Sequence, residues 1–356
     1  MDFTITLTKK LAQRIIQTPI GTLFGTIHGN EAIAHINGVK TNRDGAPAHL
    51  SLGKCSENLR TPLKENQILL NVRGEKMAAF IKEKGRLEQA KIRLISREQL
   101  FKRNRGLNVS FLRGKRVAVV GLGVGGRIAK LLVQAGVEII ILVDPDRVEP
   151  FLNQDLPLQD TGRFKTKAYT DQIKGKNPWV SVKTYEEDIT KLSEAELKQI
   201  FQGVDLLIGA TDSIKAQFKI NEIGLSLGIK TLFIGYYPGA WGGEVVWVMP
   251  GQTACYNCIF ESRLKNPDTP LHASALGSDI DLAANYAVPY ALALLGDPNR
   301  QNLINPDKNA IFFSLGCEPR WIFKNAFEKV EARTERGCEL CSRLTMNDKI
   351  KRVEKK

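Results

Sequence analysis

The sequence lacks any apolar run of the length, about 20 residues, that a membrane-spanning helix needs. Its first ten residues, Met1 to Lys10, also lack a cationic start followed by an apolar core, which a secretory leader would show. Histidine is scarce, with four residues in 356, and no His-x-His pair occurs. We therefore expect a cytoplasmic protein that has no membrane partner.

Cysteine is also sparse. Six cysteines in a chain of this length are too few for a disulfide framework. Four of them form two C-x-x-C pairs, Cys255 with Cys258 and Cys338 with Cys341. Four thiolates suit tetrahedral Zn²⁺ and leave no position for water, so such a site is structural. One zinc ion would tie the middle of the chain to its C-terminal part. The alternative is free thiols or two unrelated pairs.

The composition, 43% hydrophobic and 25% charged, is that of a globular protein with room for two domains. The net charge of +13 is high, and much of the excess lies in residues 92–116 and in the tail 349–356. We expect a solvated tail and a basic lead-in that lies near an anionic ligand. No basic motif interleaved with aromatic residues occurs, so nucleic acid is not the expected partner.

Residues 1–95 read as a separate α+β module. We predict strands at 3–7, 21–29, 31–39 and 68–72, with a turn at Asn37-Gly38 and helices at 9–17 and 75–84. The strand, the helix and the following G-x-L-x-G from Gly21 to Gly25 resemble the start of a JAB/MPN domain, the fold of metal-dependent ubiquitin-type isopeptidases. Active members carry a glutamate before that strand and a later H-x-H, and both are missing here. The resemblance therefore implies an inactive module. An unrelated binding domain is the alternative.

A strand, a glycine turn and a helix follow from residue 116. Val117 to Val120 are apolar and β-branched, and Gly121, Gly123 and Gly126 have G-x-G-x-x-G spacing. Glycines allow a backbone to approach phosphates closely, and a helix N-terminus offers free N–H groups. A second strand ends in Asp144, a little over twenty residues after Gly121. This separation in the sequence suits a carboxylate that hydrogen-bonds a ribose. Taken alone, this stretch would fit a nicotinamide-dependent oxidoreductase or a nucleotide-binding scaffold.

The chain then alternates strands and helices, which predicts an α/β domain with a parallel sheet over residues 96–345, followed by a basic tail at 346–356. Further motifs follow in a fixed series: Asp144-Pro-Asp146-Arg-Val-Glu, Asp160-Thr-Gly-Arg-Phe-Lys165, Asn177-Pro and Ala210-Thr-Asp212-Ser with Asn221. This series resembles the ThiF/MoeB/HesA superfamily, the adenylating enzymes related to ubiquitin-activating enzymes. The resemblance implies their Rossmann-like sheet and homodimer.

The resemblance also implies roles for single residues. Asp144 would bind the ribose of ATP, Lys165 its phosphates, and Asp212 would hold Mg²⁺. Asp146 and Asn153 complete the implied nucleotide-binding set. The alternative for Lys165 is a surface lysine, and that for Asp212 is a helix N-cap.

Members of this superfamily often lend an arginine to the ATP of the partner subunit. Arg105 is the first choice for that arginine, and Arg103 the second. The usual N-L-x-R-Q, whose arginine contacts the triphosphate, is replaced by Leu152-Asn-Gln-Asp. Arg147 or Arg163 is the expected substitute.

Many members also use a cysteine in the loop after the first C-x-x-C to receive the activated protein as a thioester. Residues 271–281 hold no cysteine. The nucleophile is then Cys317 or Cys55, or it has been replaced, or the adenylate passes directly to another protein. The alternative for both cysteines is a buried structural thiol.

The function implied by the resemblance is ATP-dependent adenylation of the C-terminal glycine of a ubiquitin-like β-grasp protein. The product would pass to a conjugating enzyme in a bacterial pathway of antiviral defence. One alternative is a sulfur-carrier adenylyltransferase of thiamine or molybdopterin synthesis. Another is a peptide-adenylating enzyme of an antibiotic pathway, with residues 1–95 as a peptide clamp.

Overall fold

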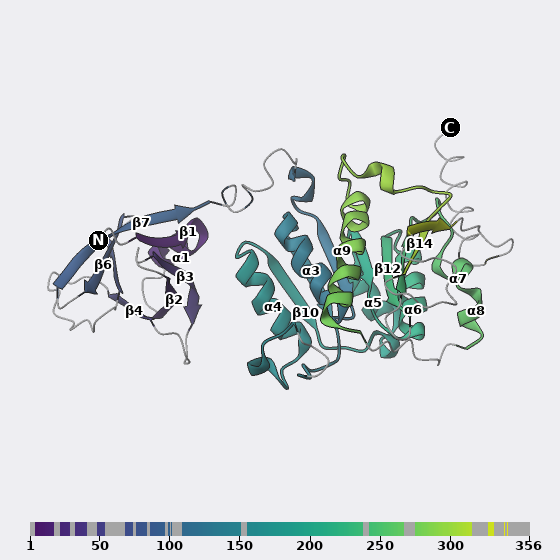
Figure 1. The fold of residues 1–356 in the computed structure, drawn as a ribbon, viewed down its shortest axis with the longest axis horizontal. Coiled ribbons are helices and arrows are strands. Elements are labelled where there is room, and N and C mark those ends of the chain that lie inside the picture. The colour runs from purple at the N-terminus through teal and green to yellow at the C-terminus, as the bar shows by residue number, and fades with distance from the viewer. Residues whose placement is uncertain are drawn as a thin grey trace. The chain divides into compact units, whose positions relative to one another are not determined.

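The computed structural model divides into two compact units, Met1–Arg105 and Gly106–Lys356 (Figure 1). It describes the chain apart from residues 1–3, 18–21, 29–32, 41–47, 54–67, 74–75, 84–85, 97–98, 100, 102–108, 151–154, 238–241, 267–274, 315–326, 331–337, 339 and 341–356. Among the described residues, no helix is both long and apolar enough to cross a membrane.

Unit 1 is a closed barrel with the strand order β1-β3-β2-β4-β5-β6-β7, in which β7 returns to pair with β1. Burial of Ile5 and Leu7 on β1 and of Leu11 and Ile15 on α1 fixes the helix against the barrel wall. The elements are β1 (Thr4–Thr8), α1 (Lys9–Gln17), β2 (Thr22–His28), β3 (Ile33–Lys40), β4 (Ala48–Gly53), β5 (Ile68–Arg73), β6 (Lys76–Glu83) and β7 (Arg86–Ile95).

The helix predicted at 75–84 is wrong, because this segment is strand β6. Its alanines and lysines favour a helix, but β6 pairs with β5 on one side and β7 on the other. Arg73 pairs with Lys76 and Glu83 with Arg86, so only two residues, one of them a glycine, separate each pair of strands. Such short glycine-containing connections are a hairpin signal, and they outweigh the helix propensity.

The turn predicted at Asn37-Gly38 is also wrong, because β3 continues through it to Lys40. Phe24 of β2 pairs with Gly38 and Gly25 with Ile36, so Asn37 is an extra residue on β3. Asn-Gly therefore forms a β-bulge here instead of a hairpin turn.

Unit 2 is an α/β unit built on an eight-stranded sheet with the order β10-β9-β8-β11-β12-β13-β14-β15. The five strands from β10 to β12 are parallel, and β13, β14 and β15 extend the sheet as antiparallel neighbours. The strands are β8 (Arg116–Val120), β9 (Ile139–Val143), β10 (Ser181–Tyr185), β11 (Leu206–Gly209), β12 (Lys230–Tyr236), β13 (Gly242–Val248), β14 (Ala310–Ser314) and β15 (Phe327–Val330).

Helices cover both faces of this sheet, because the parallel strands are apolar on both sides. Val117 and Val119 of β8 face one core with α3, α4 and α9, whereas Ala118 and Val120 face the other with α5, α6 and α7. Figure 1 shows α9 beside α3. The α-helices are α3 (Val124–Ala135), α4 (Lys165–Lys176), α5 (Glu194–Phe201), α6 (Ile214–Ser226), α7 (Tyr256–Ile259), α8 (Glu261–Leu264) and α9 (Gly277–Leu294).

Four short 3₁₀ turns complete the described part of unit 2: Ser110–Leu112, Leu158–Asp160, Ile189–Lys191 and Gln301–Leu303. The mainly parallel sheet of unit 2, together with the smaller sheet and helix α1 among the described residues of unit 1, confirms the predicted fold class.

Candidate functional site

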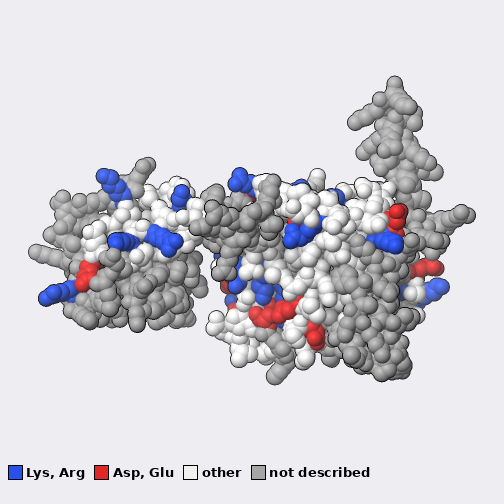
Figure 2. Space-filling view, turned by 45° about the horizontal axis from the view of Figure 1, so that its top comes forward, with Lys and Arg blue, Asp and Glu red and all other residues white. Residues whose placement is uncertain are grey.

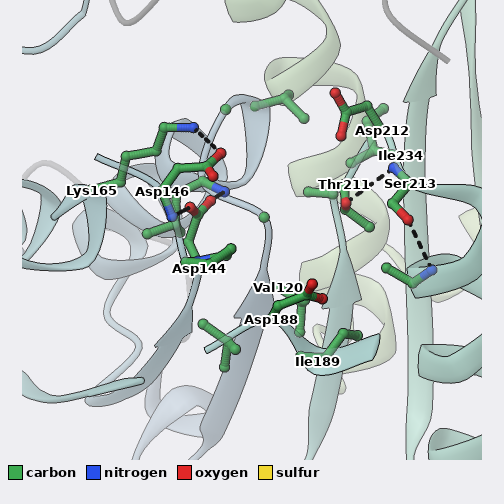
Figure 3. A pocket seen from close by; sticks show the side chains of 18 of the residues that line it. Val120, Asp144, Asp146, Lys165, Asp188, Ile189, Thr211, Asp212, Ser213 and Ile234 are labelled. Carbon is green, nitrogen blue, oxygen red and sulfur yellow. Dashed lines mark hydrogen bonds and ion pairs between the residues drawn. The ribbon is translucent and has the colours of Figure 1, made fainter. Parts of the chain in front are cut away.

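The main pocket lies at the carboxyl ends of the parallel strands of unit 2. β8, the first strand, has β9 on one side and β11 on the other, so the strand order reverses between β8 and β11. Nucleotides bind at such switch points in open α/β sheets. The pocket has a volume of about 650 Å³ and is lined by the loops that follow these strands (Figure 3).

The glycine turn after β8 forms the floor of the pocket beside the loop after β11. Gly121 has a φ of +86°, and a β-carbon there would lie 2.5 Å from the carbonyl oxygen of Ala210. Gly123, the N-cap of α3, has open space where a side chain would stand. Gly126 packs against the ring of Tyr169 on α4, 2.2 Å from where its β-carbon would be. Gly121 thus allows the turn, Gly123 leaves the backbone open to a ligand, and Gly126 allows α3 and α4 to pack closely.

Asp144, at the end of β9, ties together two loops of the pocket. One carboxylate oxygen accepts a hydrogen bond from the N–H of Leu122 (2.6 Å), and the other accepts one from the N–H of Asp146 (2.8 Å). Burial raises the pKa of Asp144, and the charge of Lys165 and these two hydrogen bonds partly offset that rise. Asp144 therefore fixes the glycine turn and the acidic loop relative to each other.

Lys165 begins α4 and points back to the acidic loop. Its Nζ lies 2.9 Å from Oδ2 of Asp146, and its N–H donates to the carbonyl of Asp146 (2.9 Å). Burial lowers the pKa of Lys165, but the charges of Asp144, Asp146 and Asp212 together raise it above its ordinary value. The ammonium group is therefore held charged in the pocket and is not a free surface lysine.

Asp212 lies across the pocket from the Lys165–Asp146 pair, in the loop between β11 and α6 (Figure 3). The N-cap of α6 is Ser213, whose Oγ accepts from the N–H of Ala216 (3.2 Å), so Asp212 is not that cap. Thr211 Oγ1 accepts from the N–H of Ser213 (3.2 Å). These hydrogen bonds fix the backbone beside Asp212, and the residue itself is exposed.

Carboxylates outnumber cations among the described residues that line this pocket. Lys165 is the single basic side chain there, whereas five side chains are acidic: Asp144, Asp146, Glu187, Asp188 and Asp212. Asp188 follows β10, and its Oδ1 accepts from the N–H (3.0 Å) and hydroxyl (2.7 Å) of Thr190. Burial raises the pKa of Asp188, but these hydrogen bonds together with nearby Lys191 outweigh it and leave the pKa below its ordinary value.

The two arginines expected to replace the missing triphosphate arginine are engaged elsewhere. Arg147 stacks on the ring of Phe164 (3.9 Å) and donates to the carbonyl of Gly162 (2.7 Å). Arg163 forms ion pairs with Asp160 and Asp171. Neither lines the pocket. A triphosphate contact by either arginine stays a prediction.

Sequence reasoning missed a third arginine, Arg127, in the first turn of α3. Its side chain is 6% exposed, and its Nε lies 2.9 Å from Asp281 and 3.7 Å from Asp155. Its position directly after Gly126 was the available signal. Asp188, Thr190 and Tyr236 were missed as well, although each follows or ends a strand at the pocket edge.

A cluster of three cysteines forms a second site. Sγ of Cys255 lies 3.7 Å from Sγ of Cys258 and 3.9 Å from Sγ of Cys338, which is 83 residues away in the chain. Thiolates about 2.3 Å from a tetrahedral zinc ion lie about 3.8 Å apart, so these thiols are spaced for a shared metal. Cys338 of the second C-x-x-C therefore meets the first pair, as predicted, whereas Cys341 lies outside the described residues. Within the described residues this is the single grouping of metal-binding side chains.

A comparison with protein families decides the identity of unit 2. The ThiF family profile matches residues 95–316, more than half of the chain. The chain belongs to the ThiF family.

Curated relatives of this ThiF protein include ubiquitin-like modifier-activating enzyme 5 of Dictyostelium discoideum, 29% identical over 164 residues, which are 43% of each chain. Another is the adenylyltransferase and sulfurtransferase UBA4 of Eremothecium gossypii, 32% identical over 153 residues, 42% of this chain and 34% of that protein. The matched region thus spans less than half the length of these two relatives.

Solved structures support the fold of the ThiF protein. MccB of Escherichia coli, crystallised with ATP, has a TM-score of 0.53 at 19% identity and covers 65% of this chain and 68% of its own. PaaA has a TM-score of 0.51 at 20% identity and covers 62% of this chain and 74% of its own. Identities this low show the fold alone.

Several predicted site residues of the ThiF protein lie outside the described residues: Arg103, Arg105, Asn153, Cys55, Cys317 and Cys341. Their roles stay predictions. On the face seen in Figure 2, the described Lys and Arg side chains occur on both units without merging into one continuous patch.

Proposed function

We propose that unit 2 uses ATP to adenylate the C-terminal glycine carboxylate of a ubiquitin-like β-grasp protein. One observation carries the proposal: Asp144 at the end of β9, Lys165 at the start of α4 and Asp212 after β11 line one pocket at the switch point. An oxidoreductase needs the glycine turn and Asp144 but gives no reason for the other two. A scaffold without catalysis would require the residues that bind ATP to have decayed, whereas Lys165 and Asp212 both line the pocket.

The chemistry has to bring two anions together, because a carboxylate attacks the α-phosphate while pyrophosphate leaves. Lys165 neutralises part of this charge, Asp144 holds the ribose side of the pocket, and Asp146 keeps the ammonium of Lys165 in place. Asp212 would hold Mg²⁺, which supplies further positive charge at the phosphates. The position of Asp212, an exposed residue on the opposite side of the pocket from Lys165, fits that role.

The excess of carboxylates in the described lining supports a need for cations from elsewhere. Mg²⁺ supplies some of them, and Arg105, with Arg103 as the second choice, would supply another to the partner subunit of a homodimer. Arg127 is an additional cation close to the glycine turn. Asn153 is retained as a nucleotide contact.

We propose Zn²⁺ for the cysteine cluster, with Cys341 as the fourth ligand. The sulfur–sulfur distances of 3.7 and 3.9 Å fit a tetrahedral ion. Zinc there would fasten the C-terminal part of the chain to α7 without taking part in the reaction.

Pyrophosphate exchange tests the proposed activity. The full chain is incubated with ATP, labelled pyrophosphate and candidate β-grasp proteins, and Asp212→Ala is compared with Asp307→Ala, an exposed aspartate outside the pocket. We expect exchange that requires a β-grasp protein and is lost with Asp212→Ala but kept with Asp307→Ala. Exchange without a protein substrate, or exchange that survives Asp212→Ala, would refute the proposal.

Two other substrates are supported by specific relatives. UBA4 is named as both an adenylyltransferase and a sulfurtransferase, which favours a sulfur carrier. MccB, a biosynthetic enzyme of microcin C7, has been crystallised in complex with N-formylated MccA, which favours a peptide. Thiocarboxylate formation on the product, or exchange driven by a short peptide alone, would select one of these.

The remaining steps are carried by the resemblance alone. A conjugating enzyme would receive the acyl group, through a thioester on Cys317 or directly from the adenylate. Residues 1–95 would be an inactive JAB/MPN-like module or a peptide clamp. A cytoplasmic bacterial pathway and a role in antiviral defence stay predictions, which a neighbouring ubiquitin-like gene would support.

A further inference from the structure

We infer that Tyr256 and Gln217 position Asp212, so that the cysteine cluster and the nucleotide pocket are linked through a buried hydrogen-bond chain. The inference rests on the proposed function for the role of Asp212. No sequence motif singled out either Tyr256 or Gln217, and neither lines the pocket.

Gln217 is the central residue of this series of hydrogen bonds. It is fully buried on α6 and is bonded at both ends of its amide. Nε2 donates to the carbonyl of Thr211 (2.7 Å), and Oε1 accepts from the hydroxyl of Tyr256. The carbonyl of Thr211 belongs to the peptide bond that joins Thr211 to Asp212. Gln217 therefore fixes the orientation of the peptide from which the Asp212 side chain projects.

Tyr256 is held rigidly at the other end. Its ring packs against Phe233 (4.3 Å between centroids) and Phe260 (4.7 Å), and its hydroxyl also accepts from Arg263 Nη1 (2.7 Å). Burial and the charge of Glu244 raise the pKa of Tyr256 well above its ordinary value. The phenol therefore stays protonated and donates to Gln217.

Tyr256 also adjoins the cysteine cluster, since it lies directly after Cys255 and two residues before Cys258. Its N–H donates to Oδ1 of Asn221 (3.1 Å), one helical turn beyond Gln217 on α6. A second tie joins Asn221 to Asn257 (2.9 Å). α7 is thus hydrogen-bonded to α6 at two residues, Asn221 and Gln217. Of these two, Gln217 also bonds the backbone next to Asp212.

A double-mutant cycle separates positioning from a general loss of stability. The dissociation constant for MgATP is measured by calorimetry on the full chain with Gln217→Met, alone and combined with Asp212→Asn. We expect Gln217→Met to weaken MgATP binding about fivefold, the size expected for losing one buried hydrogen bond. In the Asp212→Asn background it should have no further effect.

The matched control is Asn177→Leu. Asn177 is also a buried amide, bonded to Val133 and Trp179 next to the amino end of β10, away from the pocket loops. It should lower the unfolding midpoint without changing MgATP affinity. The inference would be overturned if Gln217→Met and Asn177→Leu weakened MgATP binding equally. It would also be overturned if Gln217→Met weakened binding as much in the Asp212→Asn background as it does alone.

Tyr256→Phe is the second variant, since it keeps the packed ring and removes only the hydroxyl. Hydrogen exchange at the amides of Asp212 and Ser213 gives a readout that needs no nucleotide. We expect faster exchange there in both Tyr256→Phe and Gln217→Met, and unchanged rates would contradict the positioning role. If the unmodified protein fails to bind MgATP, the proposed function is refuted. The hydrogen-exchange rates at Asp212 and Ser213 still test whether Tyr256 and Gln217 hold the Asp212 loop in place.

Discussion

A β-carbon on Gly121 would lie 2.5 Å from the carbonyl oxygen of Ala210, so the loops after β8 and β11 touch at the switch point. No L side chain fits there, because the φ of +86° is unfavourable for one and the contact is with backbone that cannot yield. The closeness of these two loops is what makes one pocket from strand ends that are far apart in the sequence.

Gly121→Ala should therefore destabilise the fold and abolish nucleotide binding. We expect a loss of ~2 kcal/mol or more in the free energy of unfolding, from the φ and the clash together. Gly123→Ala is the control, because a side chain there meets open space. It should leave the unfolding midpoint nearly unchanged and weaken ATP binding alone. Urea unfolding and ATP titration measure both, and similar stabilities for the two variants would contradict this account.

Lys165→Met should change how stability depends on pH. The pKa of Asp144 is raised by burial and lowered again by Lys165, so the variant raises it further. A carboxyl with a raised folded pKa loses stability as pH rises from its unfolded value, near 4, through the folded value. The variant's deficit in unfolding free energy should be smallest in acid and grow toward neutral pH.

The pKa of Lys165 is itself raised in the folded protein, so its charged form stabilises the fold at every pH below its titration range. That stabilisation, which the variant lacks, is lost as pH rises through the folded pKa of the lysine. Urea unfolding at several pH values checks the deficit, with the exposed Lys174→Met on the same helix as control. A deficit that does not vary with pH would show that Lys165 acts without Asp144.

Metal content tests the cysteine cluster. We expect one zinc equivalent per chain, lost in Cys258→Ser together with a lower unfolding midpoint, because three ligands hold the ion more weakly than four. Cys317→Ser should keep the metal, since that cysteine is outside the predicted ligand set. Elemental analysis and chelator release measure this, and zinc retained at full content in Cys258→Ser would remove the proposed site.

Glu244 and Arg263 form a buried, bidentate ion pair, with N–O distances of 2.6 and 2.7 Å. Arg263→Met leaves the carboxylate of Glu244 buried without its partner and should cost about 3–5 kcal/mol in unfolding free energy. The double variant with Glu244→Gln should recover at least half of that loss, because Tyr237 still has an acceptor. Denaturant unfolding decides, and a double variant weaker than the single one would contradict the reasoning.

The thioester step is tested by trapping the loaded chain without reductant. If Cys317 is the nucleophile, Cys317→Ala should remove the trapped conjugate while pyrophosphate exchange continues. A conjugate that persists in this variant would exclude Cys317 and leave Cys55 or direct transfer.

The sequence predicts the pocket through motif residues, and Gly121, Asp144, Lys165 and Asp212 all reach it. It does not predict Asp188, Thr190 or Tyr236, because these residues belong to no motif and only the strand order brings them there. Gln217 shows only a helical pattern in the sequence, since its role depends on a tyrosine 39 residues away. The helix predicted at 75–84 is wrong because the prediction rested on helix propensity, whereas the short glycine-containing connections that flank the segment make it strand β6.

The order of the strands also bears on how unit 2 assembles. β8 emerges first, and each later strand of the described sheet pairs with one already made: β9 and β11 with β8, β10 with β9, and β12 to β15 each with its predecessor. The sheet can therefore grow outward during synthesis without waiting for distant sequence. The last described residue that lines the pocket lies in α9, whereas Cys255 and Cys258 meet Cys338 only after β14 and β15 have also been made. We therefore expect the three described cysteines to come together only after the described lining of the pocket is in place.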